Sequence, residues 1–142
     1  MSHGFAVAAH WKEGFDESAI QRWVEHLRSS LRGKPSLGLV FMTPRFFPHA
    51  RQILEIIRVH GQAPLLAGCS SQALIAGSEE IEEGAGISLA LYHLPGAKLE
   101  AFHFTQENVD EANGPAYWHH ETGIEPVQAN GWLAFGDPFN LD

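Results

Sequence analysis

The sequence predicts an α/β fold: a parallel βαβαβ sheet with helices on its faces, extended by an antiparallel hairpin. Short, almost wholly apolar runs alternate with amphipathic helical segments between residues 5 and 67. That alternation is typical of strands buried on both faces of a parallel sheet. Two further segments, residues 87–94 and 98–104, then flank a Pro-Gly pair, which indicates a hairpin.

The first strand and helix are predicted from an apolar run and a helical stripe. Residues 5–9 form the run, and Asp16 is a suitable N-cap for a helix at about 16–32. Gly33 is expected to end this helix. Its apolar residues recur at spacings of three and four, so they form one stripe that is expected to face the core. These residues are Ile20, Trp23, Val24, Leu27 and Leu31.

The second strand, second helix and third strand follow the same logic. Residues 37–42 form an apolar strand bounded by prolines. Pro48 suits the first turn of a helix at about 48–60, which Gly61 ends. Residues 63–67 are the third strand. The stripe predicted for the second helix consists of Ala50, Ile53, Leu54 and Ile57.

The pattern changes after the third strand. Residues 73–76 are predicted as a short strand, and residues 77–84 as an acidic turn. The hairpin strands are residues 87–94 and 98–104, in an antiparallel arrangement.

The last part of the chain is polar, aromatic and rich in turn residues. A helix is predicted near residues 115–120 and an apolar strand at 132–135, followed by Gly-Asp-Pro. A strand with that ending opens a new βα unit, yet no helix follows. We therefore expect one domain over residues 1–142, truncated at its C-terminus and able to form a homodimer through the uncovered face.

Composition excludes several classes of partner. The 142 residues include 9 Lys and Arg against 17 Asp and Glu, a formal charge of −8. That balance disfavours nucleic acid and anionic membranes, both of which need a basic face. The single cysteine cannot form an internal disulfide. No apolar run is long enough for a signal peptide or a membrane span, so a cytoplasmic location is expected.

The candidate site centres on the end of the third predicted strand. Four small residues there bring backbone N–H groups, hydroxyls and a thiol to one point: Gly68, Cys69, Ser70 and Ser71. In open α/β sheets, ligands bind at the carboxyl ends of the strands. The alternative is a tight turn in which the serines cap local backbone groups.

Polar residues also follow the other predicted strands. They are His10, Trp11, Thr43, Arg45 and Asp137. If the strands are parallel neighbours, these side chains join residues 68–71 at one rim, which suits a small polar ligand. The alternative is that Thr43 and Asp137 cap helices while His10 packs beneath Trp11.

No metal or cofactor site is predicted. The sequence His119-His120-Glu121 contains metal-ligating types, but adjacent side chains point apart in helices and strands. The glycines lack the spacing of phosphate-binding loops. The glutamates of residues 79–83 are read as a solvated turn.

Residues 65–77 resemble the FIST N-terminal domain, a sensory module of intracellular signalling proteins. That family has an apolar strand, Gly-Cys-Ser/Thr-Ser, an apolar pair, acidic residues and a Val/Ile-Ser-Leu strand. The matching positions are residues 68–71, Leu74 and Ile75, Glu79 and Glu80, residues 87–89, the strand before Thr43 and Pro44, and residues 135–139. The chain departs at Gln72 and Ala73, where many members carry glycine.

The resemblance implies a domain that binds small ligands, with amino acids proposed for the family. It also implies a second FIST-type domain and a signalling output module, such as a kinase, cyclase, chemoreceptor or F-box module. The leading hypothesis is therefore a ligand-binding sensory domain without catalysis. One alternative is an enzyme with Cys69 as nucleophile and His10 or another histidine at a strand end as base. The other is an interaction module that uses the aromatic residues near the C-terminus.

Overall fold

A computed structural model describes residues 4–82 and 84–136 and shows a mixed α/β protein. The chain divides into two compact units, Met1–Glu100 and Ala101–Asp142, and each is described by itself. The expectation of a single domain over the whole chain stays a prediction.

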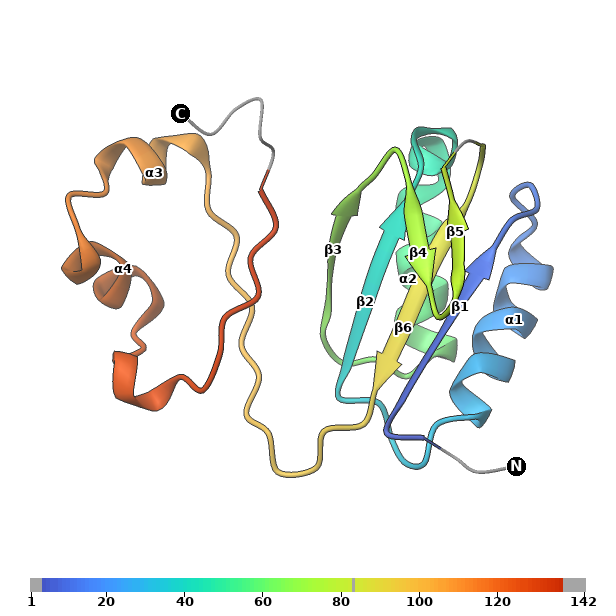
Figure 1. Ribbon diagram of the computed structural model, residues 1–142, viewed down its shortest axis with the longest axis horizontal. Helices are drawn as coiled ribbons and strands as arrows, with labels where there is room; N and C mark the ends of the chain where they lie inside the picture. The colour runs from blue at the N-terminus through green and yellow to red at the C-terminus, as the bar shows by residue number, and fades with distance from the viewer. Residues whose placement is uncertain (1–3, 83, 137–142) are drawn as a thin grey trace. The chain divides into compact units, whose positions relative to one another are not determined.

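The first unit contains a four-stranded sheet in the order β1-β6-β2-β3 (Figure 1). The strands are β1 (Ala6–Trp11), β6 (Ile87–Tyr92), β2 (Leu37–Met42) and β3 (Leu66–Ser70). β2 and β3 are parallel, whereas β6 runs antiparallel to both of its neighbours. The α/β class is confirmed, but the sheet is mixed rather than parallel.

The apolar character of β6 explains its central position. Ile87, Leu89 and Leu91 have no exposed surface, and Ser88 is buried as well. A strand that is buried on both faces is stabilised most where other strands cover both of its edges. Because β6 reverses direction against β1 and again against β2, strands β1, β2 and β3 all run the same way. Their carboxyl ends therefore lie at one edge of the sheet, as the sequence predicts.

Helices α1 (Glu17–Ser29) and α2 (Ala50–His60) pack against each other on one face of the sheet (Figure 1). The predicted cap is confirmed, because the Asp16 carboxylate accepts a hydrogen bond from the Ala19 N–H at 2.9 Å. α1 ends with its C-cap at Ser30, three residues before the predicted glycine. A 3₁₀ helix, η1 (Pro44–His49), leads into α2, and Gly61 caps α2 as predicted.

The core lies between the helices and the sheet. α1 contributes Ile20, Val24 and Leu27 to the core. The buried face of α2 differs from the predicted one, because Ile56 is buried whereas Leu54 is 37% exposed. The core residues include Ile20, Val24, Leu27, Val40, Met42, Phe46, Ile53, Ile57, Leu89 and Leu91.

A two-stranded ribbon covers part of the opposite face of the sheet. It consists of β4 (Leu74–Ala76) and β5 (Glu79–Ile81), which pair antiparallel. The Ser88 hydroxyl, on the face away from the helices, donates to the Ile75 carbonyl at 3.0 Å. The short strand predicted at 73–76 is confirmed as Leu74–Ala76. Residues 79–81, within the acidic turn predicted at 77–84, form a strand instead.

Two further predictions are wrong. Residues 98–104 form no strand, because both edges of β6 are already paired with β1 and β2 and no edge remains for a hairpin partner. The third strand is Leu66–Ser70 and not 63–67. Gly68, Cys69 and Ser70 therefore lie inside β3, whereas the predicted strand ended before them.

The second unit contains α3 (Gln106–Glu111), α4 (Pro115–Thr122) and the 3₁₀ helix η2 (Pro126–Gln128). α4 confirms the helix predicted at 115–120. No strand forms at residues 132–135, contrary to the prediction. None of the described residues of this unit is buried, and Trp132 is 63% exposed.

Candidate functional site

A groove of about 620 Å³ lies between β3 and α2. Gly68, Cys69 and Ser70 form part of its lining from the strand side. The rest of the wall is largely apolar: Val40, Met42, Phe47, Ala50, Leu54, Leu66 and Ala67. The groove therefore includes three of the four residues at the centre of the predicted site, together with a helix that the sequence analysis did not assign to it.

Three charged side chains of α2 line the same groove. Arg51, Glu55 and Arg58 are spaced so that they share one side of the helix, and all three are exposed. None of the three forms an ion pair within residues 4–82 and 84–136. Both guanidinium groups can therefore bind an anionic group, and the carboxylate can bind a cationic one.

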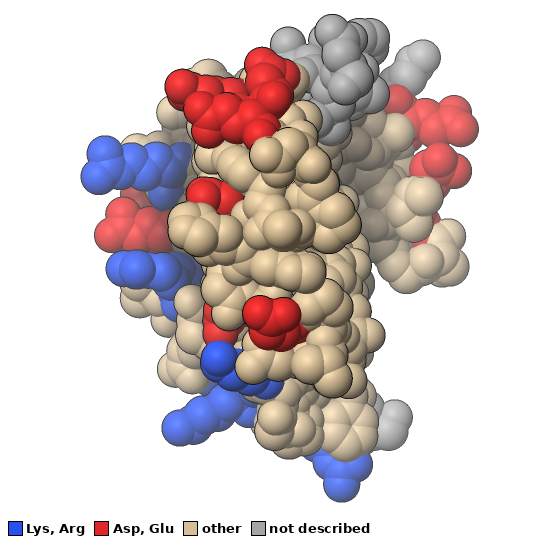
Figure 2. All heavy atoms as spheres, turned by 90° about the vertical axis from the view of Figure 1, so that its left-hand side faces the viewer, with Lys and Arg blue, Asp and Glu red and all other residues tan. Residues whose placement is uncertain are grey.

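These residues were not predicted as site residues because they lie within a helix and not at the end of a strand. A helix that packs beside an edge strand also presents side chains to that strand. The i, i+4, i+7 spacing of Arg51, Glu55 and Arg58 was the available signal. On the face shown in Figure 2, Lys and Arg lie toward the left edge and the bottom, with Asp and Glu between them on the left and in a group at the top.

Gly68 occupies an unusual backbone conformation inside β3. Its φ angle is 149°, and a Cβ atom built on it would lie 1.8 Å from the Val40 carbonyl oxygen. β2 and β3 thus approach each other at this point more closely than a side chain permits. The glycine is required by strand pairing.

His10 is not part of the groove. It pairs with Ser88 in the sheet register, on the face that the β4–β5 ribbon covers. Its Nε2 lies 3.1 Å from the Glu79 carbonyl oxygen, and its Nδ1 is buried without a hydrogen-bond partner among the described residues. Because a carbonyl oxygen only accepts, Nε2 carries the ring proton in this contact. This hydrogen bond therefore links β5 of the ribbon to β1 of the sheet.

A surface ion pair lies beside this histidine. Lys12 Nζ and a Glu79 carboxylate oxygen are 2.6 Å apart. The hydrogen bond from Lys12 holds the pKa of Glu79 below its ordinary value of 4.5. This glutamate thus contacts the segment after β1 through its side chain and His10 through its backbone.

Thr43 and Trp11 have structural contacts as well. Thr43 is buried, and its hydroxyl accepts a hydrogen bond from the Gly86 N–H at 3.0 Å. Trp11 donates to the Gly14 carbonyl at 3.1 Å and packs against Trp23 with ring centroids 5.9 Å apart. Neither residue lines the groove.

The remaining predicted residues lie apart from the groove or outside the described chain. Arg45 is exposed in η1 and is not part of the groove lining. The Ser71 hydroxyl donates to the Ala73 carbonyl, which fits the local capping alternative. Asp137 lies outside the described residues.

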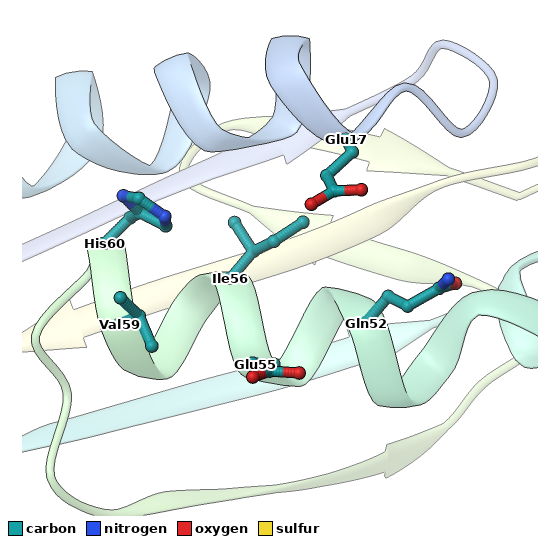
Figure 3. Close-up of a pocket in the computed structure, with 6 residues that line it drawn as sticks. All are labelled: Glu17, Gln52, Glu55, Ile56, Val59 and His60. Carbon is teal, nitrogen blue, oxygen red and sulfur yellow. The ribbon is translucent and has the colours of Figure 1, made fainter.

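A smaller cavity of about 210 Å³ lies between α1 and α2. Figure 3 shows Glu17 pointing toward α2, while Ile56 and His60 point toward α1. Glu25 on α1 accepts from Gln21 at 3.0 Å and lies 2.9 Å from His60 Nδ1. The pKa of Glu25 is lowered, mainly by the hydrogen bond from Gln21 and to a lesser degree by the hydrogen bond with His60. These contacts join the two helices.

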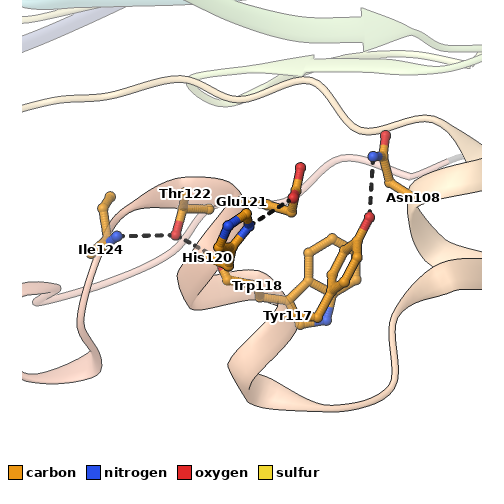
Figure 4. Close-up of polar contacts among 7 residues, drawn as sticks. All are labelled: Asn108, Tyr117, Trp118, His120, Glu121, Thr122 and Ile124. Atoms are coloured by element: carbon orange, nitrogen blue, oxygen red, sulfur yellow. Dashed lines mark hydrogen bonds and ion pairs between the residues drawn. The ribbon is translucent and has the colours of Figure 1, made fainter.

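His120 of α4 contacts a neighbouring residue on its own helix. His120 Nδ1 lies 3.2 Å from a Glu121 carboxylate oxygen, and the Thr122 hydroxyl donates to the Trp118 carbonyl at 2.7 Å (Figure 4). Asn108 of α3 donates to the Tyr117 hydroxyl at 3.3 Å. Within the described part of the chain, no three His, Cys, Asp or Glu side chains gather as a metal site requires.

Cys69 has no histidine partner among the described residues. The thiol is exposed and makes no hydrogen bond to a histidine among the residues that the structure describes. A nucleophilic cysteine needs a base within hydrogen-bond reach. His10, the base named in the enzyme hypothesis, hydrogen-bonds instead to the Glu79 carbonyl oxygen.

No protein-family model, curated protein or solved structure matches this chain. None of the helices in residues 4–82 and 84–136 has the length and apolar character needed to cross a bilayer.

Proposed function

We propose that this chain is an intracellular sensory domain that binds a small ligand in the groove between β3 and α2. One observation carries the proposal: Arg51, Glu55 and Arg58 line an apolar groove and make no ion pair with any described residue. Ligand sites combine apolar walls with a few polar groups that fix the orientation of the ligand.

The charge pattern favours an amino acid or a related metabolite. The two guanidinium groups bind a carboxylate, and the Glu55 carboxylate accepts hydrogen bonds from an ammonium group. Leu54, Leu66 and Met42 provide apolar surface for the remainder of the ligand. A ligand with both charges uses all three groups of the helix.

The resemblance of residues 65–77 to FIST domains supports a sensory role. On that basis the chain acts in the cytoplasm, together with a second FIST-type domain and a signalling output module. It performs no chemistry of its own, and its partner is a small molecule and not a nucleic acid. The exposed Cys69 contributes to the groove lining without acting as a nucleophile.

Thermal unfolding in the presence of amino acids and related metabolites tests the proposal. A ligand at one hundred times its Kd stabilises the folded state by about 2.7 kcal/mol, which raises the Tm measurably. We expect Arg51→Gln and Arg58→Gln each to remove most of the shift. Arg22→Gln is the matched control, because Arg22 is exposed on α1 and does not line the groove.

Two outcomes would contradict the proposal. One is that no compound of this class changes the Tm of the parent chain. The other is that a compound stabilises the parent and the groove variants equally, which would place the ligand elsewhere on the molecule.

A further inference from the structure

The outer edge of β3 is unpaired in the described residues. β3 is the last strand in the sheet order, and its only partner is β2. The Gly38 N–H donates to the Leu65 carbonyl, and the Ser71 N–H donates to the Met42 carbonyl. In a parallel pair with this register, the N–H and C=O groups of Leu66, Gly68 and Ser70 point away from β2.

The residues of this edge strand lack the charges and prolines that usually prevent strand pairing. Natural edge strands carry lysine, proline, inward-pointing charges or a covering segment. Residues 65–73 contain no charged residue and no proline. Gly68, Cys69 and Ser70 are exposed and small, so a second strand can approach the backbone.

The outward-facing groups are also complementary to themselves. Leu66, Gly68 and Ser70 are evenly spaced, with Gly68 at the centre of the five-residue strand. If a two-fold axis passes through Gly68, each Leu66 lies opposite the partner's Ser70, and the two Gly68 residues face each other. All outward N–H and C=O groups of the strand are then paired.

The flanking side chains fit the same arrangement. The exposed Phe47 and Leu54 line the groove beside β3 and become covered when a second copy approaches. The two copies of α2 then run antiparallel, so Glu55 of one copy faces a helix that carries the partner's arginines.

We propose that two copies of this chain associate by antiparallel pairing of their β3 strands about an axis at Gly68. The pairing extends the four-stranded sheet across the two copies and closes the open side of each groove. This proposal does not depend on ligand binding, since its readout is the oligomeric state and the strand register.

Disulfide cross-linking tests the register. Ala67 lies opposite the partner's Cys69 as a non-hydrogen-bonded pair, with a Cα–Cα distance of about 4.5 Å, within the range for a disulfide. The two Cys69 residues are diagonal neighbours at about 7–8 Å, which is too far. We therefore expect Ala67→Cys in the full chain to form a covalent dimer under mild oxidation, whereas the parent chain does not.

Ile75→Cys is the matched control, because Ile75 is exposed on β4 and away from the β3 edge. It adds a second cysteine without joining the proposed interface. If Ile75→Cys cross-links as fast as Ala67→Cys, or if Ala67→Cys stays monomeric on a non-reducing gel, the proposed register is overturned.

Sedimentation velocity over a range of protein concentrations tests the association itself. The parent chain should dimerise, and Ser70→Pro should raise the dimer Kd about tenfold or more, because it removes an outward N–H from each copy. The N–H of Ser70 is not used in pairing with β2, so this variant keeps the sheet of each copy. A parent chain that stays monomeric, or a dimer that Ser70→Pro leaves unchanged, overturns the proposal.

Discussion

Gly68 and Val40 face each other across the β2–β3 pair so closely that a Cβ atom on residue 68 would lie 1.8 Å from the Val40 carbonyl oxygen. No side-chain rotation relieves such a contact, because both atoms belong to or adjoin the backbone. The same residue lines the groove proposed as the ligand site. The groove and the pairing of these two strands therefore depend on one glycine.

Gly68→Ala should lower the free energy of unfolding by about 2 kcal/mol or more, since it combines a strained φ angle with a backbone collision. Urea unfolding measures the change. Gly77→Ala is the control: Gly77 has a φ of 63° but no atom within 4 Å of its Cβ position, so we expect a loss of only about 1 kcal/mol. Equal losses for the two variants would contradict the collision.

Thr43→Val should destabilise the fold by about 1–3 kcal/mol, because it leaves the buried Gly86 N–H without its hydroxyl acceptor. Thr43→Ser keeps the oxygen and should cost less. Thermal unfolding compares the two variants. If Thr43→Val is as stable as the parent chain but loses ligand binding, Thr43 is a site residue after all.

Asp16→Ala should cost about 0.5–2 kcal/mol, because the cap of α1 loses the acceptor for the Ala19 N–H. Asp16→Asn retains a side-chain oxygen and should remain close to the parent stability. Denaturant unfolding measures both variants. A loss of the same size for Asp16→Asn would indicate that charge near the helix N-terminus matters more than the hydrogen bond.

Glu79→Gln should lower stability at neutral pH and have no effect in strong acid. The pKa of Glu79 is lowered in the folded state, so its contribution is present above the ordinary value of 4.5 and is lost as the pH falls through the folded pKa. The effect should be small, because the ion pair with Lys12 is exposed to solvent.

The measurement is the difference in unfolding free energy between Glu79→Gln and the parent chain at several pH values. Glu80→Gln is the control, because Glu80 is also exposed on β5 and forms no ion pair among the described residues. A difference that persists unchanged into acid would exclude the Lys12 contact as its cause.

The sequence predicted well those elements that depend on local signals. The strand at 37–42, the Asp16 cap, the end of α2 at Gly61 and the short helix near 115–120 all formed where the pattern placed them. Each rests on apolar spacing or on a capping residue, and both act within a few residues of chain.

The candidate site could be predicted only in part. Gly68, Cys69 and Ser70 line the groove, but His10, Trp11 and Thr43 make structural contacts elsewhere. The three strands do share a direction, so their carboxyl ends meet one edge as expected. However, β6 separates β1 from β2, and the β4–β5 ribbon covers His10.

The sequence by itself therefore determined the α/β class, the direction of the first three strands and the segments that form α1, α2 and α4, but not α3. Tertiary structure alone decided the strand order and the composition of the groove. β6 could have paired with residues 98–104, but burial on both faces stabilises it more between β1 and β2. The groove likewise depends on packing α2 beside an edge strand, which places Arg51 and Arg58 in the same groove as Gly68 although no local pattern connects them.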